Sequence, residues 1–274
     1  MSIDERERVH RKFQETFDKI EGHAEFIEGL RYHIYGSEAD QDEIFTYYKK
    51  AAELSKVPSI QYMVGMFYLK GLGTESSRTL ARKWFLLSAE NGCADAQYSL
   101  WRLNYEEARR CCFCGIEEGL KWLKKAAESG LPKAEHDFGV NYLEGEIVDK
   151  DEEKGFAWVL KAAEKGHLNA QYITSGNYMF GIGVEKDEKK GFEWLSIAAS
   201  HDYPPAVYGV GRCYELGLGV AQDFEKAYDW FVKASLLKEP DAFMCLMEDD
   251  VVEDEEEDEE EAYLKAEREG MQMY

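Results

Sequence analysis

A tryptophan recurs along this chain at an almost constant interval. The last four of the series are 36 residues apart and the first lies 38 residues earlier: Trp84, Trp122, Trp158, Trp194 and Trp230. A second series keeps the same interval and the same two-residue insertion: Ile60, Ala96, Ala134, Ala170, Ala206 and Ala242. Two series that share a period indicate an internal repeat. A period of this length predicts stacked supersecondary units in place of one compact core.

Each repeat has the pattern of two helices joined by a glycine turn. In the repeat that starts at Ala206, the residues at offsets 0, 4, 5 and 8 fall on one face of a first helix. Gly217 and Gly219 predict the end of that helix, because glycine adopts the left-handed conformation of a C-cap at low cost. Asp223 is a suitable N-cap for the second helix, whose apolar stripe follows: Ala227, Trp230 and Ala234. The repeated tryptophans are expected to be interior, so that Trp194→Ala would cost about 3–5 kcal/mol of stability.

The same pattern predicts repeats starting near 24, 60, 96, 134, 170 and 206, within a repeat domain at 24–247. In the third of them the glycine turn is replaced by YEEARRCCFCG, which accounts for the extra residues. The apolar spacing near the N-terminus predicts a capping helix within 1–23, and 248–274 is interpreted as an acidic tail with a short C-terminal helix. No segment has the alternation of a strand, so the sequence predicts an all-α fold.

Two of the repeats carry a motif that is typical of a known family. The segments GIGVEKDEKKGFEWLSIAA and GLGVAQDFEKAYDWFVKA resemble the Sel-one-like repeat, a relative of the tetratricopeptide repeat. The resemblance extends over roughly residues 24–246. It implies a right-handed α–α superhelical solenoid that serves as an adaptor surface for other proteins, and it brings no catalytic residues with it.

The chain is strongly acidic, with a formal net charge of −22. Residues 248–261 include 12 Asp and Glu among 14 residues, and we interpret them either as a solvated tail or as an arm that approaches a basic partner. Phosphate binding requires clustered Lys and Arg, so we expect no nucleic acid partner. The N-terminus is charged, and no apolar run approaches the ~18 residues of a membrane helix. These features predict a cytoplasmic protein without membrane contact.

The sequence offers no convincing catalytic or metal motif. A structural zinc site requires two cysteine pairs, or one pair with histidines, and Cys111, Cys112 and Cys114 have no histidine near them in the sequence. Three interpretations of them remain open: a metal site, a redox-sensitive thiol cluster, or ordinary reduced cysteines. The six histidines are far apart in the sequence, and no phosphate-binding loop occurs. We therefore expect no cofactor, no metal and no enzymatic activity.

A candidate binding surface follows from helix geometry. With the core at offsets 0, 4, 5 and 8, offsets 2, 3, 6 and 10 lie on the opposite side of the first helix, which lines the concave face in solenoids of this kind. Aromatic residues recur at offset 2, and Arg102 and Arg212 at offset 6 have no obvious partner four residues further on. Tyrosine and arginine are frequent in binding hot spots. The predicted partner-binding residues are Tyr62, Tyr98, Arg102, His136, Tyr172, Tyr208 and Arg212.

Two classes of function remain open. The first is a non-enzymatic adaptor that holds a peptide or helix of another protein in the concave face. The second is a cytosolic acidic inhibitor or immunity-type protein that caps a basic toxin or enzyme. The offset-2 aromatics have an alternative interpretation as packing between neighbouring first helices. The chain itself is expected to be a monomer or to self-associate weakly.

Overall fold

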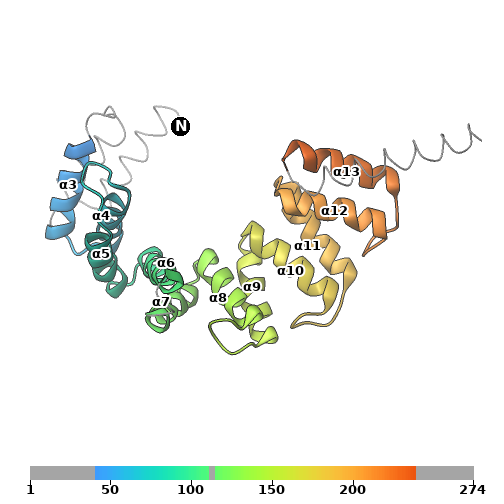
Figure 1. Ribbon diagram of the computed structural model, residues 1–274, viewed down its shortest axis with the longest axis horizontal. Helices are drawn as coiled ribbons and strands as arrows, with labels where there is room; N and C mark the ends of the chain where they lie inside the picture. Colours follow the sequence, from blue (N-terminus) through green and yellow to red (C-terminus); the bar gives the residue numbers. More distant parts are fainter. Residues whose placement is uncertain (1–40, 111–114, 239–274) are drawn as a thin grey trace, which may run out of the picture. The chain divides into compact units, whose positions relative to one another are not determined.

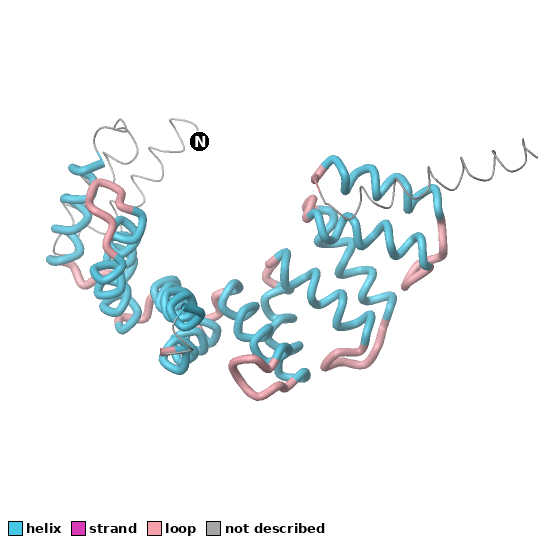
Figure 2. The backbone as a smooth tube through the Cα atoms, viewed as in Figure 1, coloured by secondary structure: helices cyan, strands magenta, loops and turns pink. Residues whose placement is uncertain are grey.

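The computed structural model describes residues 41–110 and 115–238 (Figure 1). Every regular element in these ranges is an α-helix, as Figure 2 shows. In chain order they are α3 (Gln41–Leu54), α4 (Pro58–Lys70), α5 (Arg78–Glu90), α6 (Ala94–Arg110), α7 (Ile116–Glu128), α8 (Pro132–Glu144), α9 (Glu152–Glu164), α10 (Leu168–Phe180), α11 (Glu188–Ser200), α12 (Pro204–Leu216) and α13 (Phe224–Leu236). The predicted all-α class is confirmed. The predictions for 1–23, for the cysteines at 111–114 and for 248–274 lie outside the described residues.

The helices pack as successive pairs. Along the chain, α4 packs on α5, α6 on α7, α10 on α11 and α12 on α13. The chain divides into two compact bodies, Met1–Glu135 and His136–Tyr274, and the boundary falls within α8. We call them the N-terminal body and the C-terminal body. Each has its own buried core, which includes Val64 and Leu100 in the N-terminal body and Leu195 and Val210 in the C-terminal body.

Capping groups hold both helix ends at each glycine turn. Gly181 and Gly217 end α10 and α12 in the left-handed conformation, as predicted. At the start of α13, Asp223 accepts a hydrogen bond from the backbone N–H of Lys226 (3.0 Å), and the Lys226 ammonium returns to the same carboxylate (2.7 Å). That ammonium also lies 5.5 Å from the ring centre of Tyr214 on the first helix. The arrangement recurs in the two preceding repeats, with Asp151, Lys154 and Tyr142 and with Asp187, Lys190 and Tyr178. Each cap therefore also ties the second helix to the first.

The two helices of a repeat cross closely over a small residue. In α12 the residue at offset 5 is Gly211, and a Cβ added there would lie 2.6 Å from the ring of Phe231 on α13. Phe231 is buried, and the same contact joins Gly65 to Phe85 in the N-terminal body. Burying a phenylalanine side chain contributes ~1.5–3 kcal/mol. The burial is possible here because the facing position has no side chain.

The large side chain that is fully buried in each second helix is not the tryptophan. All five repeated tryptophans are half-buried. The residue that follows each of them is buried: Phe85, Leu123, Val159, Leu195 and Phe231. The expectation that Trp194 is interior is therefore wrong, and the cost of Trp194→Ala falls below that of a fully buried aromatic residue. In three of the five repeats a lysine ammonium lies over the tryptophan ring: Lys125 over Trp122, Lys161 over Trp158 and Lys233 over Trp230.

A second small residue completes each helix crossing, three positions before the tryptophan. The facing pairs are Gly65 with Ala81, Trp101 with Gly119, Gly139 with Gly155, Ser175 with Gly191, and Gly211 with Ala227. Trp101 is the one large residue at offset 5 in the described repeats, and it faces a glycine. A Cβ added at Gly119 would lie 3.1 Å from the Trp101 ring. A bulky side chain at one position is thus balanced by the absence of a side chain at the other.

The repeat that lacks the glycine turn makes a polar contact with its neighbour. Its first helix, α6, has 17 residues, against 13 in α4, α8, α10 and α12. Arg82 of α5 donates hydrogen bonds to Asn104 (2.7 Å) and to Glu107 (2.7 Å), which the longer helix supplies. At the equivalent place in the C-terminal body, the ring of Phe192 meets Tyr214 edge-on, with 5.6 Å between ring centres. A hydrogen-bonded pair therefore takes the place of an aromatic pair.

Gly211→Ala is expected to destabilise the protein by about 1–3 kcal/mol, because the added methyl group would overlap the buried ring of Phe231. Gly176→Ala on α10 is the matched control. Nothing lies within 4 Å of a Cβ added there, so its better helix propensity should stabilise the protein by about 0.5–1 kcal/mol. Urea denaturation followed by circular dichroism measures both free energies of unfolding. Equal effects of the two substitutions would contradict the close crossing.

Candidate functional site

Two of the predicted tyrosines lie in the N-terminal body, and both make packing contacts. The ring of Tyr62 lies 5.6 Å from the ring of Phe85, measured between centres and tilted by 35°. The ring of Tyr98 faces the Lys133 ammonium at 5.0 Å, and that ammonium is paired with Asp95 at 2.6 Å. Both tyrosines are half-buried. They therefore support the interpretation as packing residues while keeping part of each ring accessible.

The tyrosines of the C-terminal body are held in a similar way. The ring of Tyr208 lies 5.6 Å from that of Phe231, the residue buried at the helix crossing. Tyr172 is more open, with 38% of its surface exposed. Its ring meets the ring of Tyr203 at 5.9 Å between centres, in an edge-on arrangement. The next repeat thus fixes the orientation of Tyr172 without covering it.

Both predicted arginines have acidic partners on their own helices. Arg102 is paired with Glu106, four residues further on, at 3.7 Å, and Arg212 is paired with Glu215, three residues further on, at 2.5 Å. The expectation of no partner four residues further on is therefore wrong for Arg102, whereas Arg212 finds its partner three residues further on. Each pair is nearly neutral as a whole. Each arginine therefore offers a partner its planar guanidinium group but little net positive charge.

His136 departs from the prediction because its side chain is buried, with 9% of its surface exposed. Its Nδ1 lies 2.8 Å from a carboxylate oxygen of Asp137, and its ring centre lies 4.7 Å from that of His167. His167 is the N-cap of α10, where its Nδ1 accepts a hydrogen bond from the backbone N–H of Ala170 (3.2 Å). Burial and then the neighbouring His136 lower the pKa of His167 below its ordinary value of 6.5, and Asp137 opposes this shift. The two histidines are a contact between repeats, and the folded state favours a neutral His167.

The most exposed apolar side chains of the first helices lie at offset 10. Phe180, the last residue of α10, is 74% exposed, and Leu216, the last residue of α12, is 52% exposed. The sequence-based prediction omitted both, although helix geometry places offset 10 on the same side as offsets 2 and 6. In addition, α10 carries no Asp, Glu, Lys or Arg along its 13 residues. We define the first-helix surface of the C-terminal body as Tyr172, Phe180, Tyr208, Arg212 and Leu216.

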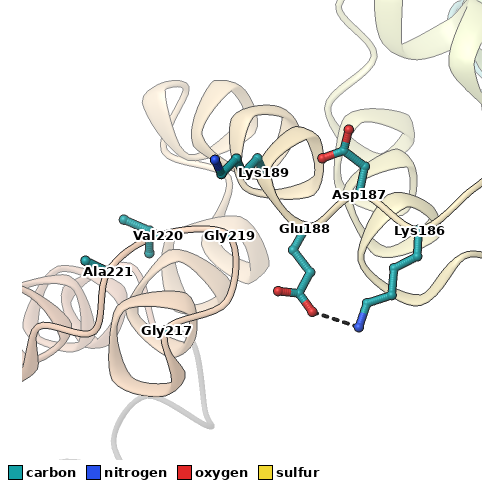
Figure 3. A pocket seen from close by; sticks show the side chains of 8 residues that line it. All are labelled: Lys186, Asp187, Glu188, Lys189, Gly217, Gly219, Val220 and Ala221. Carbon is teal, nitrogen blue, oxygen red and sulfur yellow. Dashed lines mark ion pairs between the residues drawn. The ribbon is translucent and has the colours of Figure 1, made fainter.

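A separate open recess of about 600 Å³ lies between the turn before α11 and the turn after α12 (Figure 3). On its wall, Glu188 pairs with Lys186 at 2.7 Å, and the hydrogen bond from Lys186 lowers the pKa of Glu188. Gly219 approaches the backbone carbonyl of Glu188 so closely that a Cβ would not fit. Gly183 meets the carbonyl of Glu152 in the same way. The recess is therefore a place where successive turns pack together.

Along residues 41–110 and 115–238, the remaining reactive groups form no further site. No three His, Cys, Asp or Glu side chains gather there as a metal site would require. Cys213 is a free thiol whose burial raises its pKa to about 11, so it stays protonated near neutral pH. In the same residues, no helix combines the length and the apolar character needed to cross a membrane.

Comparison with known protein families identifies the repeat. The family model described as Sel1 repeat matches residues 29–56, 58–93, 116–131, 132–167, 168–203 and 204–238. The matches omit residues 94–115, which hold α6 and the segment that replaces the glycine turn. The repeat that departs from the sequence pattern is therefore also the one that departs from the family model.

Two solved structures and one curated protein are similar to this chain. The protective antigen c5321 of uropathogenic Escherichia coli, which displays an SLR fold, is 29% identical with a TM-score of 0.73, over 81% of this chain and 47% of that one. A Sel1 repeat protein from Oxalobacter formigenes is 28% identical with a TM-score of 0.67, over 77% of this chain and 84% of that one. The putative sel1-like repeat-containing protein L21 of Acanthamoeba polyphaga mimivirus is 31% identical over 83 residues, which are 30% of this chain and 14% of the viral protein. This chain thus spans less than half of the Escherichia coli protein and a small part of the viral one.

The stability of the protein is expected to fall as the pH drops below about 6.5, the ordinary pKa of histidine. The pKa of His167 is lower in the folded chain than in the unfolded chain, so the unfolded state binds more protons in this range. The contribution of His167 is fully present above that pH and is lost as the pH falls through the folded pKa. Protonation also removes the acceptor that caps α10. Thermal unfolding between pH 8 and pH 5 measures the loss.

His167→Asn supplies the control for this pH dependence. Asparagine is a good N-cap but does not titrate, so the variant should match the parent near pH 8 and lose less stability at pH 5. An identical pH profile for parent and variant would show that His167 is not the titrating group.

Proposed function

Because the chain belongs to the Sel1 repeat family, we propose that it is a non-enzymatic scaffold that binds another protein through the first-helix surface of its C-terminal body. The observation that carries this proposal is the exposure of Phe180 and Leu216 at the ends of α10 and α12. A partner that covers these apolar side chains is stabilised in the complex by ~25 cal/mol per Å² of apolar area removed from water. Exposed apolar patches rimmed by polar residues are typical of contact sites.

The neighbouring side chains suit recognition because they are already ordered. Tyr208 rests on Phe231, Tyr172 is held by Tyr203, and Arg212 is fixed by its ion pair. A partner that contacts these groups loses little of their side-chain entropy on binding, which preserves affinity. Tyrosine and arginine are also enriched among the residues that dominate binding free energy. These features support an adaptor that receives a peptide or helix of another protein.

The charge of the chain favours a second candidate, an acidic inhibitor that caps a basic toxin or enzyme. Its supporting observation is the net charge of −22, together with the run of 12 acidic residues in 248–261. In this case long-range attraction would speed association with the basic partner. Binding would then depend on the acidic segment and on salt more than on the first helices.

Affinity capture from a native lysate tests the two candidates against each other. The baits are the intact chain, a chain ending at Met247, and a chain carrying Phe180→Ser and Leu216→Ser. We expect the partner to be retained by the truncated chain and its affinity for the double variant to fall about tenfold or more. Both substituted side chains are more than half exposed, so the thermal unfolding of the double variant should match that of the parent.

The opposite pattern would identify the inhibitor. In that case the partner is lost with the truncation alone, stays bound to the double variant, and binds less tightly as salt screens the acidic run. Tyr172→Ala with Tyr208→Ala is a useful further bait, because it removes the two predicted tyrosines of the same surface.

A further inference from the structure

Gly176, in the middle of α10, is the one described helix-interior glycine that no neighbouring atom requires. At each of the others, an added Cβ would lie within 3.2 Å of another part of the chain: Gly65, Gly119, Gly139, Gly155, Gly191, Gly209 and Gly211. At Gly176 nothing lies within 4 Å. Glycine inside a helix lowers stability relative to alanine. Packing within the protein therefore does not account for this residue.

Two exposed aromatic residues flank the glycine on the same stripe of the helix. Tyr172 and Phe180 lie four residues before and four residues after Gly176, a rise of about 6 Å in each direction. Tyr203 contacts the Tyr172 ring and donates a hydrogen bond from its hydroxyl to Asn169 (3.2 Å). These contacts hold the Tyr172 ring in place. We call Tyr172, Gly176 and Phe180 the Gly176 notch. The backbone of α10 is uncovered at Gly176, and an exposed aromatic residue lies one turn away in each direction.

The notch is uncharged, but two features of the C-terminal body favour a cation on the side of the first helices. Phe180 is the last residue of α10, where the negative end of the helix dipole attracts positive charge. On α8, the position equivalent to Phe180 is the exposed Glu144. Desolvation, followed by repulsion from Glu146, raises the pKa of Glu144, and His136 opposes the shift. A positive group beside Glu144 would relieve that repulsion.

We propose that the Gly176 notch receives a bulky apolar side chain from a basic amphipathic helix of the partner protein, with a Lys or Arg of that helix beside Glu144. The inference rests on the proposed function and names the chemistry of the partner. The missing Cβ lets the apolar side chain reach the backbone of α10 between the two rings. Anchors of this kind are typical of helices that bind in a groove.

Charge argues against the two other occupants that the chain itself could supply. The acidic run at 248–261 would bring like charge to Glu144 and Glu146. A second copy of the chain carries the same net charge of −22. In the C-terminal body, residues 136–238 hold 17 Asp and Glu against 11 Lys and Arg. Long-range repulsion therefore disfavours an acidic occupant and favours a basic one.

The test uses peptides of about 16 residues, a length that forms a short helix, selected from a random phage-displayed library on the intact chain. Selected peptides are synthesised with a fluorescent label, and their affinities are measured by anisotropy against the parent and its variants. We expect a net positive charge and a bulky apolar residue in the peptides. We also expect about tenfold or greater weakening by Gly176→Leu, which fills the notch, and weaker binding to Glu144→Lys.

Ala157→Leu is the matched control, because it adds the same side chain at an exposed position of α9 without changing charge. It should leave the affinity unchanged. Leucine is a better helix former than glycine, so thermal unfolding of Gly176→Leu at or above the parent temperature would show that any loss of binding is not a loss of folding.

The remaining outcomes separate this inference from the proposed function. Suppose that a peptide binds Gly176→Leu as tightly as the parent but binds Tyr208→Ala more weakly. This result would overturn binding at the Gly176 notch and would still support binding at the first-helix surface. Peptides that no first-helix substitution weakens, or a selection that enriches no peptide, would overturn both. Enrichment of acidic peptides would overturn the inference that the partner helix is basic.

Discussion

The close crossing of two helices over a pair of small residues underlies the geometry of this protein. Where Gly211 faces Phe231, the missing side chain lets a ring pack directly on helix backbone, so each repeat buries a large apolar group between only two helices. The pairing of Trp101 with Gly119 shows that the pair matters more than either position alone. A single repeat is too short to bury all of its apolar side chains. The crossing buries part of them, and the neighbouring repeats cover the rest.

The contacts between successive repeats are chemically varied, although the helices are alike. One repeat presents Phe192 to Tyr214, whereas another presents Arg82 to Asn104, and the contact of buried His136 with His167 joins two more. These contacts therefore share a close fit between side chains more than one residue type. The histidine pair differs from the others in one respect, because burial lowers the pKa of His167 and makes this contact sensitive to pH.

The two sides of the first helix differ in how closely they are packed. Offsets 0, 4, 5 and 8 take part in the crossing and in the contacts between repeats, and most of their residues are small or apolar, with Asn104 as a polar exception. Two glycines show the contrast. Gly211 is required by a ring that packs against it, whereas Gly176 faces open space between Tyr172 and Phe180. The same residue type thus serves packing at one site and leaves a vacant surface at the other.

The sequence by itself determined the period and the helix pairs, because the same pattern recurs along the chain. It also determined the glycine C-caps and the aspartate N-caps in the repeats that carry them, because a cap depends on residues only a few positions apart. It also contained the Arg102–Glu106 spacing and the offset-10 residues, so those omissions were avoidable. Only the tertiary structure decided that the residue after each tryptophan is the buried one, that His136 is covered by His167, and that Phe180 and Gly176 remain open. The physical reason is that periodicity specifies which way a side chain points, whereas its burial depends on what the neighbouring helix places against it.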